Sequence, residues 1–302
     1  MLAPPAPRAP MADAPADGSP RDGSPADASP PHPGRAVATL LAGRARDHAL
    51  TVLVAGRPLA LCLDIDGTLA PIAPRPEDAR TPEPTLRTLE RLAAHPGVRV
   101  ALVTGRSTAA ARALVPVRGL WIVGNHGAET LAPDAPEPEV DPAVAAYGPA
   151  LDRLAAALKR FTGTPGVLVE NKRWSLSLHT RLAPPDARPA IVDEARALCA
   201  AEGLRADDGK AVLEFKAPVA VDKGTATLAL LARWGATAPE AGVLAAGDDA
   251  TDEHLFRRLR EAAPAACTVR VGADAPTWAA YRLDDPAALA EFLDDLADAL
   301  GA

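Results

Sequence analysis

The sequence predicts an α/β protein in which a Rossmann-like, doubly wound parallel sheet is interrupted by a smaller α+β unit. Short and almost fully apolar runs such as Leu59–Leu63 are typical of strands buried on both faces of a parallel sheet. Segments with helical spacing of apolar residues follow these runs, which is the alternation of a parallel α/β fold. The middle of the chain breaks the alternation, because two helix-strand-strand units follow each other there.

The order of elements divides the chain into four parts. Residues 1–42 form a tail rich in proline and alanine, with too few large apolar side chains to offset the entropy of ordering, so we expect disorder. The first core part, residues 43–131, is predicted to contain strands 59–63, 98–103 and 120–123 and helices 84–95 and 108–114.

The third part is the α+β insertion, residues 132–216. Its expected elements are helices 143–161 and 189–201 and strands 166–170, 174–179, 204–206 and 211–215. The second core part, residues 217–302, returns to alternation. Its expected elements are helices 224–234, 252–260 and 286–300 and strands 243–246 and 268–271.

Composition limits the partners. The chain has 302 residues and a formal net charge of −7, so we expect no nucleic acid partner. No apolar run approaches the ~20 residues of a membrane helix, and no secretory signal is visible, so we expect no membrane partner and a cytoplasmic location. Three widely spaced cysteines argue against a disulfide framework and a clustered zinc site.

Two carboxylates, Asp64 and Asp66, follow the first core strand. Ligands bind at this end of the strands in open α/β sheets, and alternate residues of an extended segment point to the same side. Adjacent carboxylates repel unless a cation or a shared proton relieves them, and hard oxygen ligands suit Mg²⁺. The alternative is an acidic turn after a strand. Gly67 permits the sharp turn that follows.

Three further segments place polar or charged side chains at the ends of predicted strands or helices. The Thr104 hydroxyl and backbone N–H groups predict an anion site, although Thr104 or Ser107 could serve only as a helix cap. Lys223 precedes a helix and could bind a phosphoryl oxygen, or could be solvated. The acidic run Gly247–Glu253 after another buried strand predicts metal ligands, with an acidic helix start as the alternative.

These four segments, in this order, resemble the signature of the haloacid dehalogenase-like phosphotransferases. The resemblance implies that Asp64 is the nucleophile that forms an aspartyl phosphate and that Asp66 is the general acid and then the base. It implies that Thr104 and Lys223 hold the phosphoryl oxygens. Mg²⁺ would be held by the Asp64 side chain, the Asp66 backbone carbonyl and Asp248, with Asp249 or Asp252 in support.

Further residues narrow the resemblance to trehalose-phosphatases, over about residues 55–300. In that family the insertion is a cap that closes over the site and binds the glucose units. The implied substrate-binding residues are Asp64, Ile65, Asp66, Gly105, Arg106, Asn125, His126, Glu129, Glu170, Lys172, Ser175, His179, Arg181 and Glu214. Strand alternation places Ser175, Ser177, His179 and Arg181 on one face, although the cap charges could also be solvated and His126 could be a loop histidine.

The expected function is Mg²⁺-dependent hydrolysis of trehalose 6-phosphate. Alternatives with the same fold are a phosphatase for sucrose phosphate or mannosyl-phosphoglycerate, a phosphomutase, or a sugar-phosphate sensor without activity. The sensor is disfavoured because every element of the catalytic set is present. The expected partners are a small sugar phosphate and, through the pathway, a trehalose-phosphate synthase, with the chain itself a monomer.

Overall fold

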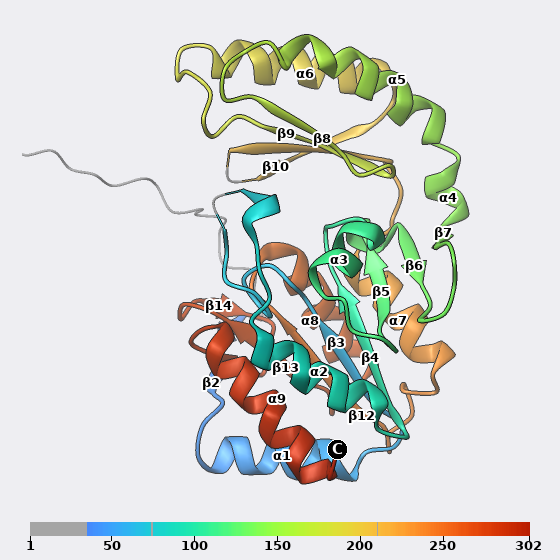
Figure 1. Ribbon diagram of the computed structural model, residues 1–302, viewed down its shortest axis with the longest axis vertical. Helices are drawn as coiled ribbons and strands as arrows, with labels where there is room; N and C mark the ends of the chain where they lie inside the picture. Colours follow the sequence, from blue (N-terminus) through green and yellow to red (C-terminus); the bar gives the residue numbers. More distant parts are fainter. Residues whose placement is uncertain (1–34, 74, 210) are drawn as a thin grey trace, which may run out of the picture. The chain divides into compact units, whose positions relative to one another are not determined.

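The computed structural model describes residues 35–73, 75–209 and 211–302, so most of the predicted tail lies outside the described residues. The main sheet has nine strands in the order β2-β15-β13-β12-β3-β4-β5-β6-β7 (Figure 1). Their bounds are β2 Thr39–Leu40, β3 Leu59–Leu63, β4 Val98–Val103, β5 Trp121–Gly124, β6 Glu129–Leu131, β7 Glu139–Val140, β12 Gly242–Gly247, β13 Cys267–Val271 and β15 Tyr281–Leu283. All its strands pair in parallel except β6 and β7 at one edge, which confirms the predicted fold class.

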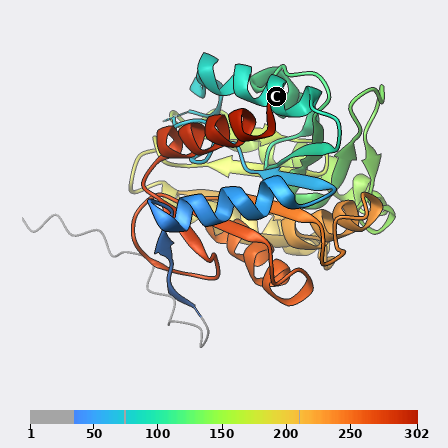
Figure 2. The ribbon, with the colours of Figure 1, turned by 90° about the horizontal axis from the view of Figure 1, so that it is seen from below.

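Alternate side chains of β3 enter two separate cores, one on each face of the sheet. Leu59, Leu61 and Leu63 belong to the core on the face covered by α1 (Arg44–Ala55), α2 (Glu83–Ala94), α3 (Thr108–Leu114) and α9 (Pro286–Leu300). Ala60 and Cys62 belong to the core under α7 (Lys223–Arg233) and α8 (Ala250–Ala262). Figure 2 shows the helices on both sides of the sheet. Burial of β3 on both faces explains its continuous apolar run.

The register brings three chemistry-bearing strand ends to one edge of the sheet. Leu63, the last residue of β3, pairs with Leu102 of β4 on one side and Ala246 of β12 on the other. The residues that follow these strands, Asp64 and Asp248 among them, therefore lie beside one another. The topology reverses at β3, which is where open α/β sheets bind their ligands.

The insertion forms its own antiparallel sheet in the order β10-β11-β9-β8. Its strands are β8 (Leu168–Asn171), β9 (Ser175–His179), β10 (Arg205–Gly209) and β11 (Val212–Lys216). Leu176, Leu178 and Phe215 pack in a core with α5 (Gly148–Leu158) and α6 (Arg188–Ala201). Helices therefore cover one face of this sheet, and its alternate residues make the opposite face polar.

One predicted helix is wrong in extent. Residues 143–161 form α4 (Pro142–Ala145), α5 and the short 3-10 helix η3 (Lys159–Phe161) instead of one helix. The break falls at Ala146–Tyr147, just before Pro149, which has no N–H to continue the preceding hydrogen-bond ladder. The other predicted helices and strands lie within a few residues of their expected bounds.

Several elements had no counterpart in the sequence prediction. These are α1, the very short strands β2, β6, β7 and β15, and a ladder between β1 (Ala36–Val37) and β14 (Pro276–Thr277). Strands of two or three residues are too short for an alternation pattern to reveal them. Within the described ranges, no helix is both long and apolar enough to cross a membrane.

Candidate active site

The loop after β3 places its carboxylates by backbone geometry. The Ile65 carbonyl accepts N–H bonds from Thr68, Leu69 and Ala70, which folds the chain into a tight turn. Gly67 has a φ of +82°, and a Cβ there would lie 2.3 Å from Asp248 Oδ2. Glycine is thus required both for the turn and for the close approach of the β3 and β12 loops.

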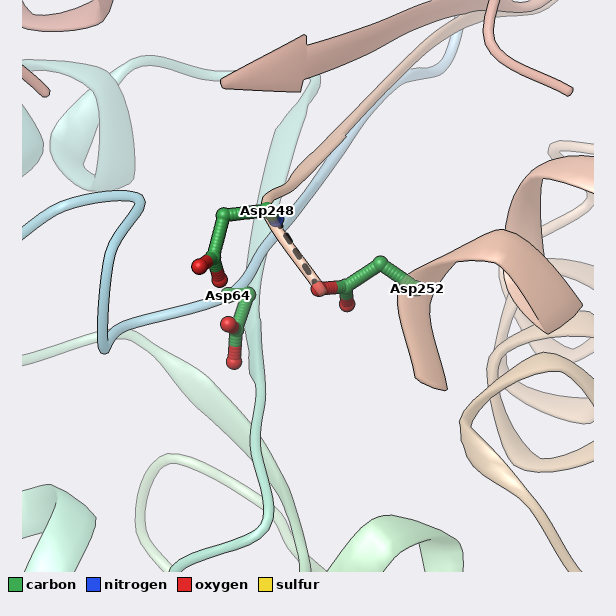
Figure 3. Close-up of side chains that lie close together, drawn as sticks. All are labelled: Asp64, Asp248 and Asp252. Atoms are coloured by element: carbon green, nitrogen blue, oxygen red, sulfur yellow. Dashed lines mark hydrogen bonds between the residues drawn. The ribbon is translucent and has the colours of Figure 1, made fainter. Parts of the chain in front are cut away.

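Three carboxylates meet at this edge of the sheet. One oxygen from each of Asp64, Asp248 and Asp252 lies within 4.8 Å of the others (Figure 3). Lys223 Nζ, at the start of α7, lies 3.0 Å from Asp64 Oδ1 and 2.9 Å from Asp252 Oδ1. A Cβ at Gly247 would lie 2.1 Å from Asp252 Cγ, so glycine is needed at the end of β12 as well.

Negative charge exceeds positive charge in this cluster. Burial, together with neighbouring carboxylates, raises the pKa of Asp64 to about 6 and that of Asp248 to about 7. Burial alone would lower the pKa of Lys223, but Asp252 and Asp64 raise it well above its usual value, so the ammonium stays charged. One ammonium does not balance three carboxylates, of which Asp64 and Asp252 are buried and Asp248 is half-buried. The donor set therefore fits a hard divalent cation.

The structure separates the roles of Asp249 and Asp252. Asp252 Oδ2 accepts the backbone N–H groups of Asp248 and Asp249, at 3.0 and 3.1 Å, while its Oδ1 accepts from Lys223. Asp249 Oδ1 caps α8 by accepting the N–H groups of Thr251 and Asp252. Burial opposes ionisation of Asp249, but Lys223 and the Thr251 hydrogen bond hold its pKa below the usual range. Both side chains organise the loop.

Asp66 is not one of these three carboxylates and pairs with an arginine. Arg106 donates from Nε to Asp66 Oδ2 and from Nη2 to Asp66 Oδ1, both at 2.7 Å. Arg106 Nη2 also donates to the Pro76 carbonyl at 3.0 Å. The fork uses both oxygens of the expected general acid. The sequence pattern indicated Arg106 as a substrate ligand and did not indicate this partner.

The loop after β4 retains the features of an anion site. Thr104 is buried, and its Oγ1 accepts the Arg106 N–H at 3.2 Å. Ser107 caps α3 by accepting the Ala110 N–H, so the cap function predicted as an alternative belongs to Ser107. A Cβ at Gly105 would lie 2.5 Å from the His126 ring, which explains the glycine between Thr104 and Arg106.

Asn125 joins the core to the insertion. Its Nδ2 donates to Glu129 Oε1 at 2.9 Å and to the Lys172 carbonyl at 3.0 Å, and its Oδ1 accepts from Ser175 Oγ at 2.7 Å. Asn125 and His126 have φ values of +49° and +56°, a left-handed conformation that non-glycine residues seldom adopt. Asn125, Glu129 and Ser175 are all buried. These three expected substrate ligands thus bond to protein groups.

The polar face of the insertion carries a row of charges. Register places Glu170 on β8, Ser177 on β9 and Glu214 on β11 side by side, with Ser177 buried between them. Glu170 Oε2 lies 3.2 Å from His179 Nε2 and 3.9 Å from Lys172 Nζ. Glu214 Oε2 lies 3.3 Å from His126 Nε2 and 2.7 Å from Lys216 Nζ. Burial opposes ionisation of Glu214, but His126 and the lysines hold its pKa far below the usual range.

Two observations adjust the expected sugar surface. Arg181 lies two residues beyond the end of β9 and is exposed, whereas Ser175 is buried. Lys216 faces the same side as Glu214 and was not among the expected ligands. The two-residue spacing of Glu214 and Lys216 on one strand is the signal that could have indicated it.

The fold and the site together define a haloacid dehalogenase-like phosphotransferase scaffold: carboxylates after β3 and β12, a threonine after β4 and a buried lysine at the start of α7. The trehalose-phosphatase family model matches residues 62–287. The chain belongs to the trehalose-phosphatase family.

Individual relatives agree with this membership. A trehalose-phosphate phosphatase of Mycobacterium avium is 36% identical over 255 residues, which cover 82% of this chain and 64% of that protein. This chain thus spans less than two thirds of the length of that curated relative. The structure of Aspergillus fumigatus trehalose-6-phosphate phosphatase matches with a TM-score of 0.61 and 27% identity, over 86% of this chain and 99% of that one. The C-terminal domain of the Candida albicans trehalose-6-phosphate phosphatase has the same fold, with a TM-score of 0.69, 22% identity, and 88% and 99% coverage.

Proposed function

We propose that this chain is a phosphatase that hydrolyses trehalose 6-phosphate to trehalose and phosphate. The observation that carries the proposal is the buried Lys223 ammonium between Asp64 and Asp252 at the edge where the loops after β3, β4 and β12 meet. Family membership and the polar face of the insertion support a sugar phosphate as substrate.

In the first half-reaction, an Asp64 oxygen attacks phosphorus and the bond from phosphorus to the sugar oxygen breaks. Asp66 gives its proton to the departing sugar oxygen, which leaves as a hydroxyl. The phosphoryl group is then bound to Asp64. Lys223 and Thr104 hold phosphoryl oxygens and offset the charge that develops on them.

In the second half-reaction, Asp66 takes a proton from water as that water attacks phosphorus. The bond from phosphorus to Asp64 breaks, phosphate is released, and the Asp64 carboxylate is restored. The proton that Asp66 gains is the one it delivers to the next sugar. The net change is one ester and one water converted to one alcohol and one phosphate.

A bound Mg²⁺ would be held by the side chains of Asp64 and Asp248 and the Asp66 backbone carbonyl, and would supply positive charge to the phosphoryl oxygens. The close approach of the Asp64, Asp248 and Asp252 carboxylates supports this assignment, because burial and neighbouring carboxylates raise the pKa of Asp64 and Asp248 and a divalent cation would relieve that crowding. Asp249 and Asp252 would support the site through the hydrogen bonds of the loop. A synthase partner, a monomeric state and a cytoplasmic location stay predictions.

The insertion would act as the cap that selects the sugar. Glu170, Lys172 and Glu214 present charged donors and acceptors on one face, which suits the hydroxyl groups of a glucose unit. His126 reaches Glu214 from the core, so sugar binding at this face would also contact the loop after β5.

The test is phosphate release from trehalose 6-phosphate, sucrose 6-phosphate and glucose 6-phosphate, each with Mg²⁺ and with a chelator. We expect strong preference for trehalose 6-phosphate and loss of activity with the chelator. Equal rates on all three sugars would indicate a broader sugar phosphatase. No phosphate release from any of the three sugar phosphates would contradict the proposal and favour a phosphomutase or a sensor.

A further inference from the structure

The loop after β5 is bonded through its backbone to the Thr104 loop, which comprises Thr104–Arg106 after β4. The Asn125 N–H donates to the Arg106 carbonyl at 2.7 Å, and the next N–H, that of His126, donates to the Thr104 carbonyl at 3.0 Å. Two backbone bonds in succession fix the path of the loop that carries the Thr104 hydroxyl. A shift of Asn125 would therefore displace Thr104 as well.

The Asn125 side chain contacts the insertion on its other side. Its Nδ2 donates to the Lys172 carbonyl at 3.0 Å, and its Oδ1 accepts from Ser175 Oγ at 2.7 Å. Both partners belong to the hairpin that joins β8 to β9, because the Lys172 N–H donates to the Ser175 carbonyl at 3.0 Å. Asn125 and Ser175 are buried, so these hydrogen bonds are shielded from water. Docking of the hairpin against the core therefore fixes the Asn125 amide.

Glu129 extends this connection to the helix that follows the Thr104 loop. Its Oε1 accepts from Asn125 Nδ2 at 2.9 Å and from the N–H of Thr108, the first residue of α3, at 2.8 Å. An amide offers two N–H donors and one carbonyl acceptor, and Asn125 uses all of these groups on Glu129 and the hairpin. One side chain thus joins the hairpin of the insertion to the start of α3.

The loop after β5 also has a backbone conformation that depends on its surroundings. Asn125 and His126 both have positive φ, and residues other than glycine keep this conformation only where neighbouring groups hold it. The loop packs closely on α3, because a Cβ at Gly124 would lie 2.8 Å from the Thr108 nitrogen. Loss of the bonds from the hairpin should therefore let the loop relax, and the Thr104 loop with it.

We propose that Asn125 is a positioning residue that couples docking of the insertion to the shape of the Thr104 loop. This inference rests on the proposed function, in which Thr104 holds a phosphoryl oxygen, and deepens it. While the hairpin is docked, the loop after β5 is held and the Thr104 hydroxyl is placed for phosphate. When the hairpin leaves, the loop relaxes and phosphate binds more weakly. Phosphate binding in the core and docking of the insertion therefore favour each other.

Ser175→Ala tests the coupling while every side chain of the core stays in place. It removes from the insertion the hydroxyl that donates to Asn125. We expect the inhibition constant of inorganic phosphate, measured against p-nitrophenyl phosphate with Mg²⁺, to rise about 3- to 10-fold, as for loss of one buried hydrogen bond. Neither compound contains a sugar, so a role of Ser175 in sugar binding alone would leave this constant unchanged. An unchanged constant would overturn the proposal.

A double-mutant cycle tests whether the effect passes through Asn125. Asn125→Gly removes the amide, and glycine suits the positive φ at this position. This variant should raise the inhibition constant of phosphate at least as much as Ser175→Ala does. Adding Ser175→Ala to Asn125→Gly should change the constant by less than about 2-fold, because the hydroxyl has already lost its partner. Additive effects would show that Ser175 acts by another route and would overturn the coupling.

Two controls separate this coupling from a general loosening of the protein. Thr162→Ala removes a hydroxyl that donates within the insertion, to the Lys159 carbonyl at 2.8 Å, and should match the wild type. The Mg²⁺ affinity of Ser175→Ala, measured by titration calorimetry, should stay within about 2-fold of the wild type. The reason is that the carboxylates that would hold the ion follow β3 and β12, not β4. A parallel fall in Mg²⁺ and phosphate affinity would overturn the proposal.

The proposed function and the coupling can fail separately. If the wild type hydrolyses p-nitrophenyl phosphate but not trehalose 6-phosphate, the proposed function fails. The inhibition constant of phosphate for Ser175→Ala then still decides the coupling. If the wild type hydrolyses neither ester, titration calorimetry with inorganic phosphate compares the same variants. Weaker phosphate binding by Ser175→Ala supports the coupling, whereas equal binding, or no binding to the wild type, overturns it.

Discussion

Lys223 Nζ lies 3.0 Å from Asp64 Oδ1, and both side chains are almost completely buried. Asp64 directly follows β3, whereas Lys223 begins α7 after the whole insertion. The insertion lies between these two residues in the sequence, yet the fold of the core brings the ammonium and the carboxylate into contact. This ion pair lies at the centre of the carboxylate cluster.

Lys223→Ala should destabilise the protein and abolish phosphate release. It leaves two buried carboxylates, Asp64 and Asp252, without their cation, and loss of one partner from a buried pair costs about 3–5 kcal/mol. Chemical denaturation measures the free energy of unfolding. Lys159→Ala, at an exposed lysine, is the matched control. An unfolding free energy within 1 kcal/mol of the wild type, by the ~1 kcal/mol scale of surface pairs, would contradict the role of Lys223.

Asp64→Asn should remove turnover and leave the fold intact. The amide retains an oxygen to accept from Lys223 but cannot attack phosphorus, so we expect phosphate release to fall by at least ~10³-fold. The melting temperature without metal should stay the same or rise, because one of the crowded charges is lost. Activity close to the wild type would refute the nucleophile assignment.

Gly67→Ala should disturb the metal site more than the same substitution at another glycine with a positive φ. Its Cβ would lie 2.3 Å from Asp248 Oδ2, in addition to the strain of a φ of +82°, which costs about 1–3 kcal/mol. Gly235→Ala has a similar φ of +70° and no atom within 4 Å of the new Cβ, so it isolates the strain. We expect only Gly67→Ala to weaken Mg²⁺ binding, measured by titration calorimetry. Equal Mg²⁺ affinity in both variants would refute this.

Stabilisation by Mg²⁺ should depend on pH. Asp64 and Asp248 have folded pKa values of about 6 and 7 without metal, above those of the unfolded chain, so the folded protein holds extra protons between about pH 4 and 7. Their contribution to stability is therefore lost as pH rises through this window. Metal must displace those protons at low pH, so the rise in melting temperature on adding Mg²⁺ should be larger at pH 7.5 than at pH 5.5.

The control for this experiment is Asp248→Asn, in which the rise should shrink at pH 7.5 because one ligand is lost. An Mg²⁺-induced rise in melting temperature that is equal at the two pH values would show that these carboxylates do not bind the ion.

Glu214→Gln should impair recognition of the sugar more than phosphoryl chemistry. Glu214 contacts His126 and Lys216 on the polar face of the insertion and is not one of the carboxylates that meet at Asp64. We expect KM for trehalose 6-phosphate to rise about 10-fold, as for loss of one charge-assisted hydrogen bond, with a smaller change for p-nitrophenyl phosphate. Steady-state kinetics on both substrates provide the measurement, and equal changes would argue against a sugar-binding face.

The sequence by itself determined the strands that hold the site and the residues that follow them. The apolar run of β3 and the carboxylates after β3 and β12 are local signals. A run of consecutive apolar residues indicates a strand buried on both faces, and the first polar residues after it mark where that strand ends. The parallel class then places Asp64 and Asp248 at one edge without knowledge of any contact.

Only the tertiary structure decided which groups these side chains use as partners. Arg106 holds Asp66 across 40 positions of chain, and Asn125 bonds to Ser175 across 50. Such pairings depend on loop paths and on the register between strands, which no local period encodes. For the same reason strand alternation correctly separated the faces of β9, but could not show that Ser175 and Ser177 are buried among protein groups.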